Sequence, residues 1–288
     1  MGRYDDAAKL AKDQLERLEH GRRTGPVVAI ARRFGEVTGM DQSGLLAIEL
    51  FTTIIPLMVI GYALASGFSS DLSPGDLVIR NMNLSGELAE TVRRTFSSSR
   101  DLHKVWSVTG LASFLIWGIP MSLTVSRLFN LAWRREPFQI GWRLARGFGW
   151  FVLYLAAIAA SLKITYLAEG NLARVTLFIV SAAPYALFWA LTPWILVRGG
   201  GKGWSYMWRV GLTGAVIDSL ALRLTARVVF PWLLAGWDGF GPIGVALTIM
   251  TWCGIIATGW VITACATAVM WERAVPIELA AEAQTATA

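Results

Sequence analysis

Six runs of apolar residues, each long enough to cross a lipid bilayer, constrain this chain more than any other feature of its sequence. A membrane-crossing helix needs ~20 predominantly apolar residues. Inside lipid the backbone must satisfy its own polar groups, so each run is expected to be helical. We therefore predict an all-α polytopic membrane protein with six transmembrane helices. The predicted spans cover residues 44–68, 106–129, 148–167, 175–197, 210–235 and 243–271.

The composition agrees with a chain that has lipid as one of its solvents. Of its 288 residues, 55% are hydrophobic and 16% are charged, whereas soluble domains carry about 25% charged residues. The sequence also has 14 tryptophans, a residue that favours the membrane–water interface. The net charge of +6 could serve nucleic acid or an anionic membrane surface, and its placement favours the membrane.

The chain divides into three parts by charge and hydropathy. Residues 1–25 are rich in both charge signs and predict a cytoplasmic segment, residues 26–273 form the six-helix membrane domain, and residues 274–288 predict a disordered cytoplasmic tail. The first long apolar run begins only near residue 44, which argues against a cleavable signal peptide. Two amphipathic helices are expected outside the spans, one at the cytoplasmic interface over 26–36 and one on the extracytoplasmic side over 84–96.

Basic residues between the spans predict the orientation. Two short connections hold eight of them against the single acid Glu136. Cytoplasmic loops carry the excess of Lys and Arg, so both connections and both termini are placed in the cytoplasm. The long connection 69–105 has balanced charge and lies outside in this topology. The eight basic residues are Arg127, Arg134, Arg135, Arg143, Arg146, Arg198, Lys202 and Arg209.

Several patches of the sequence resemble one membrane-protein family. The first span contains two threonines, two isoleucines and Pro-Leu over 52–57, the second span leaves through Asn130 and Trp133, and the last span opens with an aromatic-Gly-Pro pattern over 240–242. In this order and spacing they resemble the YihY/BrkB family of inner-membrane proteins, over residues 27–273. The chain departs from the family at Ile48 and Glu49, where members tend to have aromatic residues, so it is identified as a divergent member. The resemblance implies six helices in the bacterial cytoplasmic membrane. Members have been labelled ribonuclease BN and have been linked to envelope-lipid export and serum resistance.

Four ionisable residues inside the predicted spans are the candidate site: Glu49, Asp218, Arg223 and Arg227. Such groups cost several kcal/mol at the bilayer centre unless they are paired or hydrated. Arg223 and Arg227 are four residues apart and share a helix face, whereas Asp218 is about 140° round the helix from Arg223. The arginines then need carboxylates from another helix, a water-filled cavity or an anionic ligand. We interpret the four residues as an anion or headgroup pathway between spans one and five, and the alternative is a structural ion-pair network or snorkelling arginines.

Other chemistries have little to use in this sequence. The two histidines lie outside the apolar runs and outside any metal-binding motif, and Cys253 and Cys265 would stand about 18 Å apart on one helix, too far for a disulfide. The glycine-rich turn around Lys202 lacks the Gly-Lys-Ser/Thr order of a phosphate-binding loop. We therefore predict no metal, no cofactor, no catalytic residue and no nucleic-acid partner, and we do not expect ribonuclease activity.

These observations predict a transporter or flippase for an anionic amphipathic envelope component, a lipid or a lipid-linked molecule. Anionic membrane lipids are the expected partners, with envelope proteins as further candidates. The alternative is a non-transporting scaffold or accessory subunit of an envelope complex. The expected location is the bacterial cytoplasmic membrane.

Overall fold

Helices make up all the regular structure of the residues that the computed structural model describes, which are 25–66, 79, 85–95, 103–168, 174–200, 204–219, 225, 226 and 228–275. Within these ranges no strand occurs, so the all-α fold class is confirmed. Apart from Gly25, Ala274 and Val275, the predicted N-terminal segment and tail lie outside the described residues. The α-helices are α2 (Gly25–Glu36), α3 (Gly39–Ser66), α5 (Gly86–Thr95), α6 (His103–Ala132), α7 (Ile140–Ala168), α8 (Arg174–Leu196), α9 (Met207–Ser219), α10 (Phe230–Trp237) and α11 (Pro242–Ala274).

Five of the six predicted spans fall on single long helices. These are α3, α6, α7, α8 and α11, with 28, 30, 29, 23 and 33 residues. In the described part of the chain, three helical segments are both long and apolar enough to cross a membrane: Ile140–Ser161, Ile179–Leu196 and Pro242–Ala274. This supports a membrane protein, and the number of crossings stays a prediction.

The predicted fifth span is described only in part. Within 210–235, α9 ends at Ser219 and α10 begins at Phe230, and residues 225, 226, 228 and 229 have π-helical conformation. Residues 220–224 and 227, which include Arg223 and Arg227, lie outside the described residues. A continuous fifth span is therefore not confirmed.

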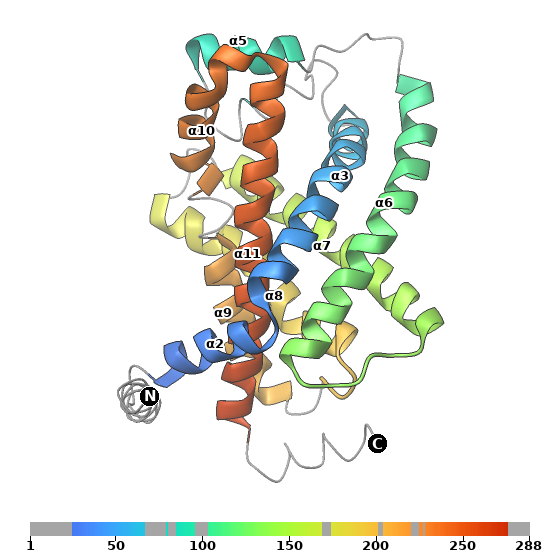
Figure 1. Cartoon of the computed structure of the whole chain (residues 1–288), viewed down its shortest axis with the longest axis vertical. Coiled ribbons are helices and arrows are strands. Elements are labelled where there is room, and N and C mark those ends of the chain that lie inside the picture. The colour runs from blue at the N-terminus through green and yellow to red at the C-terminus, as the bar shows by residue number, and fades with distance from the viewer. Residues whose placement is uncertain are drawn as a thin grey trace, which may run out of the picture.

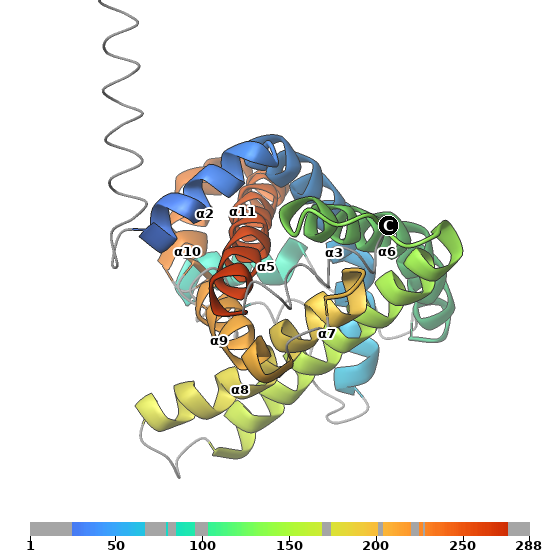
Figure 2. The ribbon, with the colours of Figure 1, turned by 90° about the horizontal axis from the view of Figure 1, so that it is seen from below.

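Six helices pack as a ring in chain order. Each of α3, α6, α7, α8 and α9 contacts the next of these along the chain, α9 contacts α11, and α11 closes the ring against α3. The view along the bundle in Figure 2 shows this arrangement, with α7 and α8 side by side and α11 between α9 and α3. The last helix, α11, thereby packs between the first and the fifth helix of the ring, α3 and α9.

Glycines bring α9 close to α8. A Cβ at Gly214 would lie 2.4 Å from the Trp189 side chain, and one at Gly211 would lie 2.3 Å from the Ala186 carbonyl oxygen. Both distances are below those that side chains tolerate, so only glycine permits this contact. Small residues at helix crossings have the same use in other membrane bundles.

Short helices lie across the two ends of the ring (Figure 1). At one end α5 runs over α10 and the start of α11, and Ala89 is buried with Phe230, Leu234 and Val245. At the other end α2 lies beside the last turns of α11. The helices predicted over 84–96 and 26–36 are therefore present as α5 and α2, and their placement on the two membrane surfaces stays a prediction.

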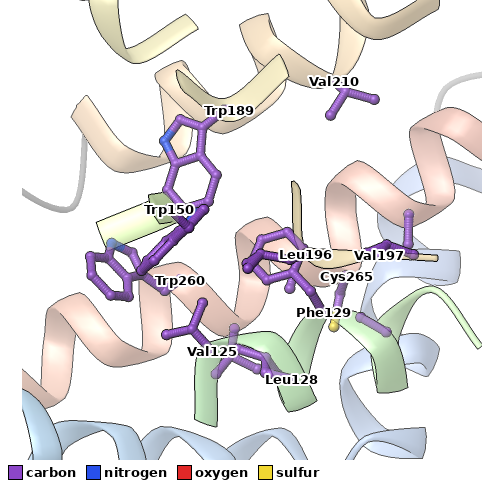
Figure 3. Close-up of a cluster of buried hydrophobic side chains, with 14 of the residues drawn as sticks. Val125, Leu128, Phe129, Trp150, Trp189, Leu196, Val197, Val210, Trp260 and Cys265 are labelled. Carbon is purple, nitrogen blue, oxygen red and sulfur yellow. The ribbon is translucent and has the colours of Figure 1, made fainter. Parts of the chain in front are cut away.

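Large aromatic side chains fill the centre of the ring. Trp150, Trp189 and Trp260 come from α7, α8 and α11, and each is at most 1% exposed. Figure 3 shows the three tryptophans in one buried cluster that also contains Phe129 of α6. We call Trp150, Tyr154, Phe188, Trp189 and Trp260 the aromatic layer, because their ring centroids lie 4.9–6.4 Å from one another in successive pairs. Such pairs add attraction beyond the burial of their area.

Candidate functional site

Of the two predicted site residues that the structure describes, Asp218 is more deeply buried than Glu49. It lies in the last turn of α9 with no solvent-exposed surface. The indole nitrogen Nε1 of Trp260, on α11, donates a hydrogen bond to its Oδ1 over 3.1 Å. A carboxylate without access to water depends on such donors, because burial of an ionised group is costly when it is not compensated. Asp218 therefore ties α9 to the helix that closes the ring.

The aromatic layer surrounds the donor of this hydrogen bond. The Trp260 ring meets Trp150 and Tyr154 edge to face, with centroid distances of 5.6 and 5.0 Å. The Trp150 indole in turn donates to the Thr192 hydroxyl over 3.1 Å. Tightly packed rings fix the direction of the Trp260 N–H, so the position of the Asp218 carboxylate is set by packing as well as by the hydrogen bond.

Glu49 occupies a second, separate polar position between α3 and α6. The hydroxyl of Thr124 donates to Glu49 Oε1 over 2.8 Å. The other oxygen, Oε2, is screened from solvent and has no hydrogen-bond partner among the described residues. Thr52 and Thr53 donate to the backbone carbonyl of Glu49, over 3.0 and 2.6 Å, rather than to its carboxylate.

The two described residues of the predicted pathway between spans one and five, Glu49 and Asp218, do not contact each other through a shared partner. Glu49 and Asp218 have different partners, Thr124 and Trp260. The helices that carry the two acids, α3 and α9, each pack against α11, which lies between them. Arg223 and Arg227 lie outside the described residues, so their relation to both acids stays a prediction.

An ion-pair network that we did not predict lies at the end of the bundle opposite α5. We call Arg33, Glu36, Arg134 and Glu272 the charged clasp. Arg33 is only 4% exposed, and its Nη2 donates to both carboxylate oxygens of Glu272 over 3.0 and 2.8 Å. Its Nη1 donates to the Ala132 carbonyl at the end of α6. One side chain of α2 thereby holds the last turns of α6 and α11 together.

Glu36 completes the charged clasp. It accepts a hydrogen bond from Arg134 over 2.6 Å and lies 3.3 Å from Arg33 Nε. The Arg134 hydrogen bond lowers the pKa of Glu36 below its usual value, and the same contact raises the pKa of Arg134. In the sequence, Arg134 is informative only as one of the basic residues that predict the orientation. An amphipathic helix with an arginine on its buried side was the one available signal that Arg33 has an internal partner.

A second set of contacts closes the end of α8. Asn130 Nδ2 donates to the Leu196 carbonyl over 3.0 Å, and Arg146 Nη1 donates to the Trp194 and Ile195 carbonyls over 3.0 Å each. The last carbonyls of a helix have no partner within it, and these side chains supply one. The Asn130 position, noted in the sequence for its resemblance to a family pattern, thus has a structural use.

No group of three or more His, Cys, Asp or Glu that could hold a metal ion occurs within the described ranges. Comparison with protein-family models, with curated proteins and with solved structures gives no match for this chain.

Proposed function

We propose that this chain is an integral protein of the bacterial cytoplasmic membrane that moves an anionic amphipathic envelope component, a lipid or a lipid-linked molecule, between leaflets. The observation that carries the proposal is the fully buried Asp218, held by Trp260 inside a bundle of apolar helices. Ionisable residues within membrane helices mark substrate or ion pathways more often than they serve stability. The resemblance to the YihY/BrkB family supports the same membrane and the same class of cargo.

Exposed tryptophans support the membrane placement. Trp142, Trp194 and Trp208 stand at the start of α7, the end of α8 and the start of α9, and each is more than half exposed. These helix ends adjoin the two basic connections, and aromatic belts occupy the interfacial level of membrane proteins. Tryptophans and basic residues at the same helix ends favour a cytoplasmic interface there.

Movement of a lipid through this protein requires a second conformation. The aromatic layer and the charged clasp hold the bundle together at its centre and at the end near α2. Transport then needs at least one contact between neighbouring helices of the ring to open. The hydrogen bond from Trp260 to Asp218 lies on the contact between α9 and α11.

A scaffold function is the second candidate, and the packed interior favours it. Buried aromatic rings and an arginine with three partners are what a rigid, non-transporting bundle would use. In that case Asp218 and Trp260 serve only to fix α9 against α11.

Lipid movement in proteoliposomes separates the two candidates. The purified protein is reconstituted with fluorescent NBD-phosphatidylglycerol, and dithionite, which does not cross the membrane, quenches only label in the outer leaflet. If the wild-type protein moves lipid, label from the inner leaflet reaches the outer leaflet and dithionite quenches it there. The transport proposal expects this additional quenching to be lost in Asp218→Asn and in the Arg223→Gln/Arg227→Gln double variant. Trp260→Phe, which removes the hydrogen bond to Asp218 and keeps a ring, is expected to slow it.

Thermal unfolding of each variant in detergent provides the control. Variants that keep the wild-type melting temperature and lose lipid movement support transport. If dithionite leaves the same fraction of label unquenched in wild-type vesicles as in protein-free vesicles, the result contradicts transport and favours the scaffold.

A further inference from the structure

The environment of Glu49 differs from that of the two glutamates of the charged clasp, Glu36 and Glu272. Its carboxylate has one hydrogen-bond donor, the Thr124 hydroxyl, at 2.8 Å from Oε1. Its second oxygen is screened from solvent and receives no donor from the described residues. By contrast, Glu36 and Glu272 each accept hydrogen bonds from an arginine.

No cation in the described part of the chain lies within ion-pair distance of Glu49. Among residues whose side chains the structure describes, the charged ones on the helices that pack against α3 are Arg32, Arg33 and Glu36 on α2, Arg127 on α6, and Glu272 and Arg273 on α11; α3 itself adds Asp41. Arg33 and Glu36 are engaged in the charged clasp. Arg127 lies three residues after Thr124, near the same face of α6, but its side chain is exposed.

The free-energy cost of placing Glu49 in this environment is higher for the ionised carboxylate than for the neutral carboxylic acid. Glu49 is half-buried and one of its oxygens, Oε2, is screened from solvent. A negative charge shared with such an oxygen needs several donors, and the single Thr124 hydroxyl supplies one. A neutral acid needs less. Its O–H donates to the Thr124 hydroxyl, which can accept as well as donate, and the 2.8 Å separation suits either direction. The remaining carbonyl oxygen carries no net charge, so its lack of a donor costs less.

We propose that Glu49 is a proton-binding site of the membrane domain. In the conformation described here the carboxyl carries a proton taken from water, held between Glu49 Oε1 and Thr124 Oγ1. Separation of α3 from α6 admits water to the carboxyl and releases the proton, leaving the carboxylate. The use of this proton to drive transport rests on the proposed function, whereas the protonation itself does not.

Infrared spectroscopy of the full-length protein in lipid nanodiscs tests the protonation directly. Near neutral pH, Glu49→Gln is expected to remove a protonated-carboxyl stretching band from the wild-type spectrum. Glu36→Gln is the matched control, since Glu36 is held ionised by Arg134; it should remove only carboxylate absorption. A Glu49→Gln spectrum that loses carboxylate absorption, with no loss of the protonated band, overturns the proposal.

A measurement on the wild-type chain covers the case in which Glu49→Gln does not fold. The membrane-soluble reagent dicyclohexylcarbodiimide adds to protonated carboxyls in apolar surroundings, and mass spectrometry locates the adduct. The proposal expects modification at Glu49 that exceeds modification at Glu36 and declines as the pH is raised. Equal modification at the two positions, or none at Glu49, contradicts it.

The two proposals fail in distinguishable ways. Absence of lipid movement in wild-type vesicles, with a protonated Glu49, refutes transport and leaves the proton site intact. Lipid movement with an ionised Glu49 refutes the proton site and leaves transport intact.

Discussion

Glu272→Gln tests whether the charged clasp holds the end of the bundle near α2. The substitution keeps the size of the side chain and removes its charge. Arg33 keeps the Ala132 carbonyl and Glu36 as partners, and the new amide oxygen can accept one of its two hydrogen bonds to position 272. Arg33 is 4% exposed, and its guanidinium stays charged at any accessible pH. Arg33 therefore cannot avoid the cost of its buried charge by losing a proton.

The size of the effect follows from the burial of the two partners. Removal of one member of a fully buried ion pair destabilises a protein by about 3–5 kcal/mol. Only Arg33 is fully buried here; the Glu272 side chain is 39% exposed, and Glu36 remains 3.3 Å from Arg33. We therefore expect a loss of about 1–3 kcal/mol. At about 2 °C per kcal/mol for a chain of this size, the melting temperature should fall by roughly 2–6 °C.

Tryptophan fluorescence during heating in detergent measures this shift. Glu136→Gln is the matched control, because Glu136 is an exposed acid in the connection after α6, and exposed substitutions change stability by about 0.5 kcal/mol or less. In the double variant Arg33→Met/Glu272→Gln no charge is left buried without its partner, so the double variant should be more stable than Glu272→Gln alone. Equal melting temperatures for Glu272→Gln and Glu136→Gln would refute the reasoning.

Two further predictions concern packing and pH. Gly214→Ala places a Cβ 2.4 Å from the Trp189 side chain and should destabilise the bundle by about 1–3 kcal/mol through overpacking. Gly149→Ala is the control, because a Cβ there meets nothing within 4 Å; it should leave the melting temperature unchanged or raise it. Equal effects of the two substitutions would contradict the close contact. The Arg134 hydrogen bond lowers the folded-state pKa of Glu36 from its ordinary 4.5, so its stabilisation is present above pH 4.5 and is lost as the pH falls through the folded-state pKa. The difference in melting temperature between wild type and Glu36→Gln should then become smaller below pH 4.5. The corresponding loss in the free energy of unfolding is a few tenths of a kcal/mol, because the contact is largely exposed. A difference that becomes larger below this pH would show that Glu36 does not act as an ionised partner.

Sequence alone was sufficient for the helical class and for most helix positions. The apolar runs at 106–129 and 148–167 fall within α6 and α7, because helix formation in an apolar run depends on local composition and on the need to satisfy each backbone polar group nearby. The run at 210–235 is described only in part: α9 ends at Ser219 and α10 begins at Phe230, so a continuous helix across it stays a prediction.

The partners of the charged residues were decided by the tertiary structure. Sequence marked Glu49 and Asp218 as unusual because a charge in an apolar run is visible in composition. It could not show that Glu49 meets Thr124 or that Asp218 meets Trp260, since these contacts depend on how neighbouring helices are rotated and aligned in depth. The same holds for Arg33 and Glu272, which are 239 residues apart in the chain. Helix rotation and depth are set by the packing of many side chains at once, so they become fixed only when the ring of helices closes.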